Sequence, residues 1–341
     1  MIKNFCKPAY LFYKNSRSYG CTKNYGGICM TTDMKDLGNP LRDIKSTFDE
    51  FIIPHRPVLW KYCFHITGSP WDAEDLVQDT LLRAFSSLSQ IWQPINPKGF
   101  LFRIASNIWI DQCRKKKLLT DSIEIVGEQA LQDEDFSFEV YGAIEELVLH
   151  LPPRQRAVIL LVDVFQFKAQ EAGEMIGCTE GAVKALLNRA RVRIKQLKAQ
   201  EKGTEEKQVI TNKQKEIINS YIESFNRRDP DGIARLLDTH VSNDIVHIAQ
   251  EYGKETVCKY SLADWAKDPV NMKAELHLLW GRYTIVQIAR LEDSLAVYDL
   301  NLLQVESDKI VDIKDYYFCP EMLEAAAKEL NMKAFPRKYV L

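Results

Sequence analysis

The 341-residue sequence has little that would tie it to a membrane or to a metal. No stretch approaches the roughly 18 uninterrupted apolar residues that a membrane-spanning helix needs. The eight cysteines include no C-x-x-C pair and no Cys/His group with zinc-ligand spacing, so we expect no metal and no cofactor. Isolated cysteines of this kind are typical of a reducing compartment, which predicts a cytoplasmic protein with buried or incidental thiols.

The sequence also lacks the overall basic charge of many nucleic-acid binders, because its formal net charge is only −2. That average hides a segregation of charge along the chain. Residues 177–200 hold six Lys or Arg and one acid, whereas residues 119–146 hold nine acids and neither Lys nor Arg. Local charge governs binding, so the net charge does not exclude a nucleic-acid partner.

The length predicts two or three domains. The basic residues 1–29 lack the continuous apolar segment of a secretory signal, and Met1, Met30 and Met34 are alternative translation starts. Composition and periodicity divide the chain into a disordered or non-native extension (1–40), a helical domain (41–118), an acidic linker (119–139), a second helical domain (140–198), a polar linker (199–211), an α+β domain (212–330) and a tail (331–341).

The segment Phe165–Lys198 predicts two helices joined by a tight turn. Gly177 ends the first helix, and Thr179 offers an oxygen to cap the second. The second helix has an apolar stripe beside a basic, Asn-bearing stripe, which suits insertion into a DNA major groove. The alternative is an ordinary solvated basic face. The DNA-binding candidates are Glu180, Lys184, Asn188 and Arg191.

Residues Ala73–Phe85 predict a helix that begins after a capping cluster at 69–72. One face of this helix is apolar and would pack inward. The second face is acidic with one exposed leucine, which suits docking of a basic protein partner. The alternative, which such a pattern indicates more often, is a merely solvated helix face. The docking candidates are Asp75, Gln78, Asp79 and Leu82.

Residues Phe100–Lys117 predict another helix, which follows a loop rich in proline and ends in a basic run. Aromatic rings beside Arg and Lys suit unstacked single-stranded bases, although such residues are also common in protein cores. The candidates for this contact are Trp92, Arg103, Asn107, Trp109, Arg114 and Lys115.

Three segments carry a family resemblance: AEDLVQDTLLRAF, GFLFRIASNIWIDQCRKKK and LPPRQRAVILLVDVFQFKAQEAGEMIGCTEGAVKALLNRAR. Over residues 48–198 they resemble the extracytoplasmic-function sigma factors of bacterial RNA polymerase. The resemblance implies two all-α domains, sigma regions 2 and 4, and a protein that is not an enzyme. It implies core RNA polymerase as the partner of helix 73–85. It also implies promoter DNA as the ligand, with helix 100–117 and its preceding loop at the −10 element and the second helix of the helix-turn-helix at the −35 element.

Two departures from the family pattern concern promoter choice. Ala185 and Leu186 stand where the family often has an Arg or a Ser-Arg pair, and Ser106 stands where a larger polar or basic residue is frequent. We therefore expect promoter contacts that differ from those of relatives.

Residues 212–330 predict helices packed in a curved antiparallel sheet, an α+β cone. The helices are predicted over 213–226 and from 229 to 237, and the strands over 244–249, 274–280, 283–291, 294–305 and 310–318. The segments NRRDPDGIARLLD and ESDKIVDIKDYYFCPEML resemble SnoaL-like domains. We favour a protein-contact role for this domain over small-ligand binding, and ligand binding over catalysis. The candidate pocket residues are His247, Trp265, His277, Tyr298 and Tyr316.

Together these features predict an alternative sigma factor whose C-terminal domain regulates its activity. The alternative is a helix-turn-helix regulator fused to a ligand-binding or cyclase/isomerase-like cone domain. The acidic docking face on helix 73–85 discriminates between them, because a simple repressor has no use for it.

Overall fold

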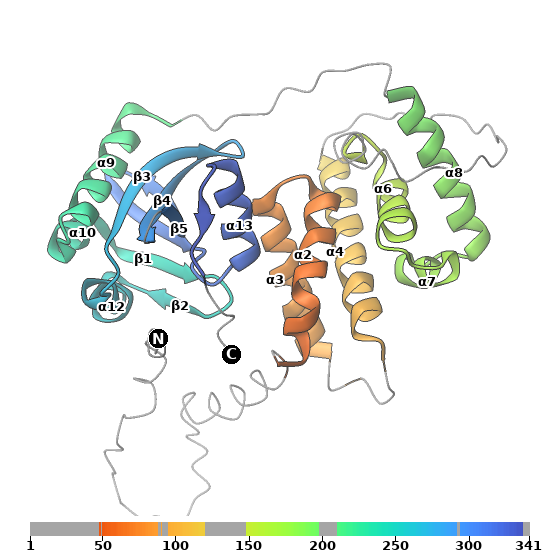
Figure 1. Cartoon of the computed structure of the whole chain (residues 1–341), viewed down its shortest axis with the longest axis horizontal. Helices are drawn as coiled ribbons and strands as arrows, with labels where there is room; N and C mark the ends of the chain where they lie inside the picture. The colour runs from red at the N-terminus through yellow and green to blue at the C-terminus, as the bar shows by residue number, and fades with distance from the viewer. Residues whose placement is uncertain are drawn as a thin grey trace, which may run out of the picture.

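The computed structural model describes residues 48, 50–87, 90, 95–119, 148–197, 210–291 and 294–336. They form two helical units and one α+β unit (Figure 1). The predicted N-terminal extension, nearly all of both linkers, and Trp92 lie outside the described residues.

The first helical unit consists of η2 (Ile53–His55), α2 (Arg56–Thr67), α3 (Pro70–Ser87) and α4 (Pro97–Leu119). The helices predicted over 73–85 and 100–117 are confirmed as α3 and α4, and each is longer by three residues at its start and two at its end. Gly68 ends α2 with φ 81°, and a Cβ there would lie 2.5 Å from Cδ2 of Leu149. The left-handed backbone conformation favours glycine at this position, and the Leu149 side chain would have to shift to admit a Cβ.

The second helical unit contains α6 (Pro153–Ile159), a π-helical turn η5 (Leu160–Val164), α7 (Ala169–Ile176) and α8 (Glu180–Leu197). The predicted helix-turn-helix is confirmed as α7 and α8. Gly177 adopts the left-handed conformation, and the Thr179 hydroxyl accepts a hydrogen bond from the Ala182 N–H at 3.2 Å. The predicted apolar stripe of α8 is buried at Val183, Leu187, Ala190 and Ile194.

The two helical units share one apolar core. The ring of Phe102 from α4 lies 4.6 Å from Tyr62 and 5.2 Å from both Phe165 and Phe167 of the second unit, measured between centroids. Burial of large aromatic rings is strongly favourable, so these contacts hold the second unit against α2 and α4.

The α+β unit follows, and most of its elements match the predicted runs. Its helices are α9 (Asn212–Asn226), α10 (Pro230–Leu236), α11 (Lys254–Val257), η6 (Cys258–Leu262), α12 (Ala263–Lys267) and α13 (Pro320–Glu329). Its strands are β1 (Leu237–Ile245), β2 (Ala249–Tyr252), β3 (Met272–Leu279), β4 (Arg282–Leu291), β5 (Ser294–Glu306), β6 (Lys309–Asp315) and β7 (Lys333–Ala334).

One predicted strand, 244–249, is wrong. β1 begins earlier, at Leu237, and residues 246–248 form the turn into β2. The register of β1 against β6 shifts between Leu237 and Ser242, and this irregularity breaks the period-2 pattern by which strands are recognised.

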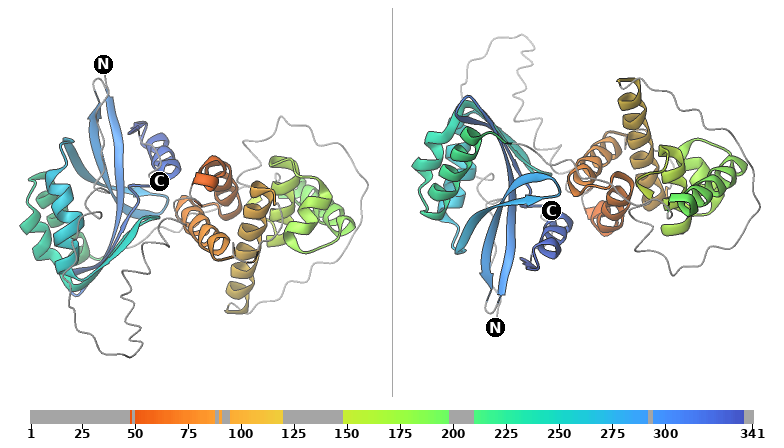
Figure 2. Two further views of the ribbon diagram at one scale, coloured as in Figure 1. Left: turned by 90° about the horizontal axis from the view of Figure 1, so that it is seen from below. Right: turned by 90° about the horizontal axis from the view of Figure 1, so that it is seen from above.

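The strands form one curved sheet (Figure 2). Their order is β2-β1-β6-β5-β4-β3, with β7 beside β5. Most pairs are antiparallel as predicted, but β1 pairs with β6, and β5 with β7, in parallel. Alternation along a strand reports its buried face and not the direction of its neighbour, so the sequence could not reveal these two pairings.

The two faces of the sheet have different neighbours. α9 and α10 cover one face, and α13 lies on the other face, between the sheet and α2 and α3 (Figure 1). A continuous apolar core runs from the helical units to Val286, Val297 and Leu300 on this second face. The α+β unit is therefore packed against the first helical unit.

Candidate nucleic-acid and protein interfaces

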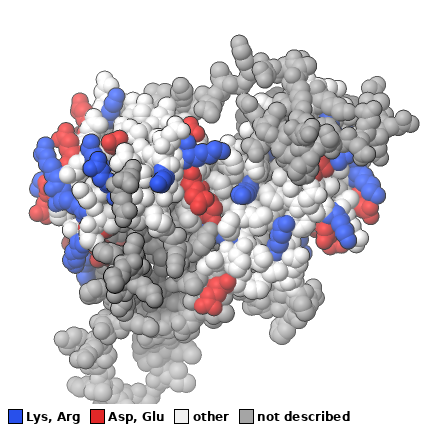
Figure 3. All heavy atoms as spheres, in the orientation of Figure 1, with Lys and Arg blue, Asp and Glu red and all other residues white. Residues whose placement is uncertain are grey.

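The exposed start of α8 presents the first candidate DNA-binding residues. Glu180 and Lys184 form an exposed i,i+4 ion pair of 2.8 Å. Asn188 lies one turn further along and is half-buried. Charged side chains of both signs gather at the end of the molecule formed by α7 and α8 (Figure 3). The N-terminal half of α8 is thus an accessible polar surface.

Arg191, the fourth candidate on α8, is held by the protein itself. Its Nε and Nη2 donate to Oδ2 and Oδ1 of Asp163 at 3.1 and 2.9 Å. Both side chains are largely buried, with 26% and 23% exposed. Sequence reasoning missed this bidentate pair because Asp163 lies 28 residues away, on η5.

The candidates on α4 divide between surface and core. Arg103, Asn107, Arg114 and Lys115 are exposed, and Arg114 pairs with Asp111 at 3.3 Å. Trp109 is only 6% exposed, and the Arg156 guanidinium covers its ring at 5.2 Å. In the described arrangement Trp109 is therefore a contact between the two helical units and not a surface for bases.

The docking candidates on α3 form the predicted second face. Leu82 is 62% exposed, and Asp79 is also exposed. Partial burial, followed by the charge of Asp75, raises the pKa of Asp79. Gln78 and Asp75 are half-buried, and the Asp75 carboxylate accepts a hydrogen bond from Nζ of Lys314 at 2.6 Å. A basic side chain of the α+β unit thus already contacts this acidic face.

The same contact extends along the start of α3. The indole N–H of Trp71 donates to the Leu279 carbonyl at 3.3 Å, and its ring meets Trp280 and Tyr316 edge-on, each with 5.3 Å between centroids. Arg282 approaches Asp72 at 3.8 Å. Trp71 is 1% exposed, so the α+β unit seals the N-terminal turn of α3.

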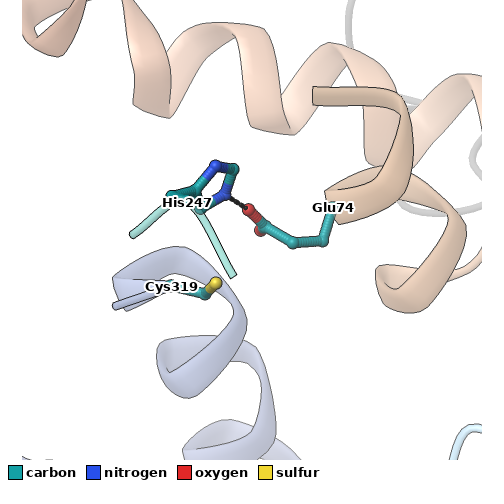
Figure 4. A group of neighbouring side chains, drawn as sticks. All are labelled: Glu74, His247 and Cys319. Carbon is teal, nitrogen blue, oxygen red and sulfur yellow. Dashed lines mark hydrogen bonds and ion pairs between the residues drawn. The ribbon is translucent and has the colours of Figure 1, made fainter. Parts of the chain in front are cut away.

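A buried charged cluster, which we call the clasp, lies deeper in this contact and consists of Arg56, Glu74, His247 and Glu321. Arg56 donates to Glu74 at 2.6 Å and to Glu321 at 2.9 Å, and His247 also contacts Glu74 (Figure 4). Burial would raise the pKa of Glu74, but the charge of Arg56 and hydrogen bonds from His247 and Trp60 together lower it to about 2. The clasp thus holds an ionised carboxylate inside the protein.

Cys319 lies beside the clasp, so that Glu74, His247 and Cys319 bring three metal-ligating atoms within 4.8 Å of one another (Figure 4). Zinc spacing in the sequence could not reveal this group because its members come from distant segments. The Arg56 guanidinium, however, lies 2.6 Å from Glu74 and 2.8 Å from His247. Burial and the nearby Glu74 charge also raise the pKa of the Cys319 thiol. A cation already occupies the group, and its thiol is protonated, which makes it a poor metal site.

The five candidate pocket residues of the α+β unit do not come together. Tyr298 donates to Asp268 at 2.7 Å, and Trp265 packs on Phe225 with 4.8 Å between ring centroids, on the side of α9. His247 and Tyr316 instead contact α3, and His277 lies on β3, 3.4 Å from Glu275. Two of the five thus belong to the contact with the helical unit.

Comparisons with known families match both helical units in order. Residues 51–118 match the model of Sigma-70 region 2, and residues 141–194 match that of Sigma-70 region 4. Among the described residues, none of the helices has the length and apolar content to cross a bilayer.

Curated relatives align to the same part of the chain. It is 30% identical to the ECF RNA polymerase sigma factor SigL of Mycobacterium tuberculosis over 166 residues, which are 47% of this chain and 90% of SigL. It is 34% identical to SigG of the same organism over 180 residues, 45% of this chain, and so spans about half (49%) of SigG. Among solved structures it is similar to M. tuberculosis SigJ, with 18% identity, 78% of this chain and 95% of that chain covered, and a TM-score of 0.30.

Proposed function

Because the chain belongs to the extracytoplasmic-function sigma factor family, we propose that it directs core RNA polymerase to specific promoters and helps to open them. The observation that carries this proposal is the pairing, in one chain, of the region 2 helices with a folded helix-turn-helix. The exposed start of α8 would contact the −35 element, and the exposed residues of α4 would contact the −10 element. The polymerase itself supplies the chemistry of RNA synthesis.

To contact both promoter elements at once, the two helical units must reach sites that are far apart on the DNA. The −35 and −10 elements are about 25 base pairs apart, roughly 85 Å at about 3.4 Å per base pair. Phe102 and Phe165, one from each unit, are in ring contact at 5.2 Å. We propose that the described arrangement is a closed state, and that the two units separate when the protein binds polymerase and promoter.

The α+β unit supplies the regulation in this proposal. Lys314 neutralises Asp75, which we assign to the polymerase-docking face of α3, and Arg282 approaches Asp72 beside it. A basic surface on the polymerase would compete for the same carboxylates, since one carboxylate cannot pair fully with two partners. The α+β unit therefore lowers the affinity for polymerase while it stays docked on α3.

The test is in vitro transcription with purified core polymerase, comparing the full chain with a chain truncated after about residue 205. We expect both proteins to start transcription at the same promoters, with the truncated chain more active. Absence of promoter-specific transcription by both would contradict the sigma-factor assignment.

A point variant separates competition from a general effect of truncation. Lys314→Glu places a like charge beside Asp75 and should raise the affinity of the full chain for core polymerase about fivefold, as expected for about 1 kcal/mol from a partly exposed pair. Lys309→Glu makes the same charge change at the other end of β6, away from α3, and is the matched control. Equal effects of the two variants would argue against competition at Asp75.

A further inference from the structure

A bidentate ion pair between Asp163 and Arg191 connects α8 to η5. Asp163 lies in the π-helical turn Leu160–Val164, and Arg191 lies in the second half of α8. Their two hydrogen bonds, of 3.1 and 2.9 Å, join a planar guanidinium to a carboxylate in parallel. Such bidentate pairs are stronger than hydrogen bonds between neutral groups, and their two parallel bonds fix the relative orientation of the two side chains.

The position of Arg191 along α8 matters for the residues that precede it. Arg191 follows Asn188 by three residues and Lys184 by seven, so all three lie along one stripe of the helix. Lys184 lies in the exposed half of α8, whereas Arg191 is tied to the body of the second helical unit. The stripe is therefore anchored to the unit at Arg191 and exposed to solvent at Lys184.

The apolar contacts of α8 with its unit include Val183, Leu187, Ala190 and Ile194, all of which are buried. Hydrophobic contact is non-directional, so these residues keep one side of the helix buried without selecting a hydrogen-bonded orientation. The Asp163–Arg191 fork adds a directional contact, because a small rotation of α8 would break both hydrogen bonds.

We propose that Asp163 and Arg191 are positioning residues for the DNA-contacting face of α8, with Lys184 and Asn188 as the residues that meet the DNA. This inference rests on the proposed function, in which α8 contacts the −35 element. It removes Arg191 from the set of direct DNA contacts and adds Asp163, an acid that would otherwise only repel DNA, to the residues on which recognition depends.

The experiment uses the full chain bound to core polymerase and a pool of random double-stranded DNA, from which the wild-type complex selects its preferred duplex. Affinity for that duplex and for a scrambled duplex is then measured for Asp163→Asn. If Arg191 positions α8, the variant should bind the selected duplex about tenfold more weakly, which corresponds to loss of one charge-assisted pair. Its affinity for the scrambled duplex should change little.

A direct DNA contact by Arg191 predicts the opposite change in the affinity of Asp163→Asn for the selected duplex. If Arg191 itself contacts DNA, Asp163→Asn removes a competing acid, frees the guanidinium and tightens binding to the selected duplex. Tighter or unchanged binding overturns the proposal. The reciprocal exchange, Asp163→Arg with Arg191→Asp, should recover part of the lost affinity. If circular dichroism shows that Asp163→Asn has lost helix content, this exchange becomes the deciding test. Failure to recover would then count against a positioning pair.

Two further variants separate this proposal from the function on which it rests. Arg189→Gln removes an exposed charge of α8 outside the stripe and should reduce affinity for both duplexes alike, without changing the ratio between them. Lys184→Ala should weaken binding to the selected duplex. If the wild-type complex selects no duplex, or if Lys184→Ala has no effect, the proposed function of α8 fails; if selection succeeds and Asp163→Asn tightens binding, only the positioning role fails.

Discussion

Glu74 is a carboxylate with no exposed surface that nevertheless stays ionised in the folded protein. Arg56, Trp60 and His247 all contact it, so its two oxygens are satisfied without water. Removal of one member of such a buried set leaves the others charged and unpaired, which costs far more than loss of a surface ion pair. The clasp is therefore where a single substitution should disturb the docking of the α+β unit most.

The lowered pKa of Glu74 determines how its contribution to the free energy of unfolding changes with pH. Because this pKa is about 2 in the folded protein against an ordinary value of 4.5, the carboxylate stabilises the folded state above pH 4.5, and this contribution is lost as the pH falls towards 2. The difference corresponds to roughly 3 kcal/mol. We expect Glu74→Gln to lower the free energy of unfolding by about that amount at neutral pH, with the gap to wild type closing between pH 4.5 and 2.

Denaturant unfolding followed by tryptophan fluorescence at several pH values measures this gap. Glu306→Gln, at an exposed position on the far end of β5, is the matched control and should shift stability little at any pH. A gap that stays constant down to pH 2 would show that Glu74 is not held ionised by the clasp.

The side chain of Arg156 links helix α6 to α2. Its guanidinium donates to the Ile66 carbonyl at 2.9 Å in the last turn of α2, donates also to the Leu149 carbonyl, and covers Trp109 of α4. A cation at a helix C-terminus is favourable because the free carbonyls there carry partial negative charge. Arg156 thus closes the second helical unit onto the first.

Arg156→Ala should loosen this closure without unfolding either unit. Loss of charge-assisted hydrogen bonds corresponds to about 2 kcal/mol, or a roughly thirtyfold rise in the open population. Hydrogen exchange of the α4 amides around Trp109 should accelerate accordingly. Arg154→Ala changes an exposed residue of the same helix and should leave that exchange unchanged; equal acceleration in both variants would assign the effect to α6 stability instead.

Elements with strong local signals could be predicted from the sequence. The apolar stripes of α3, α4 and α8 repeat at helical spacing, and Gly177 and Thr179 mark the turn of the helix-turn-helix, so these helices were found with errors of about a turn or less. The parallel pairs and the irregular strand β1 leave no such mark.

The environment of the candidate site residues was harder to predict. Trp109 and Arg191 are residue types that often contact nucleic acids. In the fold, however, Trp109 is buried under Arg156, and Arg191 is paired with Asp163. The clasp joins Arg56 to Glu321 across 265 positions, a separation at which local pattern carries no information. The sequence therefore does not show which polar side chains are paired within the protein and which remain accessible to a partner.

The molecule as a whole is built around α2, α3 and α4, with the second helical unit on one side and the α+β unit on the other (Figure 1). Both neighbours cover residues assigned to function: the second helical unit buries Trp109, and the α+β unit contacts Asp75. The same helices thus carry both the surfaces that we propose for polymerase and for DNA and the contacts that cover them. Release of the two neighbours would expose both surfaces.

A reversible bond between the helical units tests whether they must separate. Gly99 of α4 lies against Met175 of α7, and a Cβ at Gly99 would be 3.5 Å from Cε of Met175. Gly99→Cys with Met175→Cys, in a chain whose other accessible cysteines are replaced by serine, can be joined by a short bis-methanethiosulfonate linker, which fills the space left by the shorter side chain at position 175 and keeps the units closed. We expect the linked protein to lose transcription from a promoter with both elements and to regain it when reduction removes the linker. The same sample before and after reduction is its own control, and full transcription by the linked protein would mean that the closed arrangement already reads both elements.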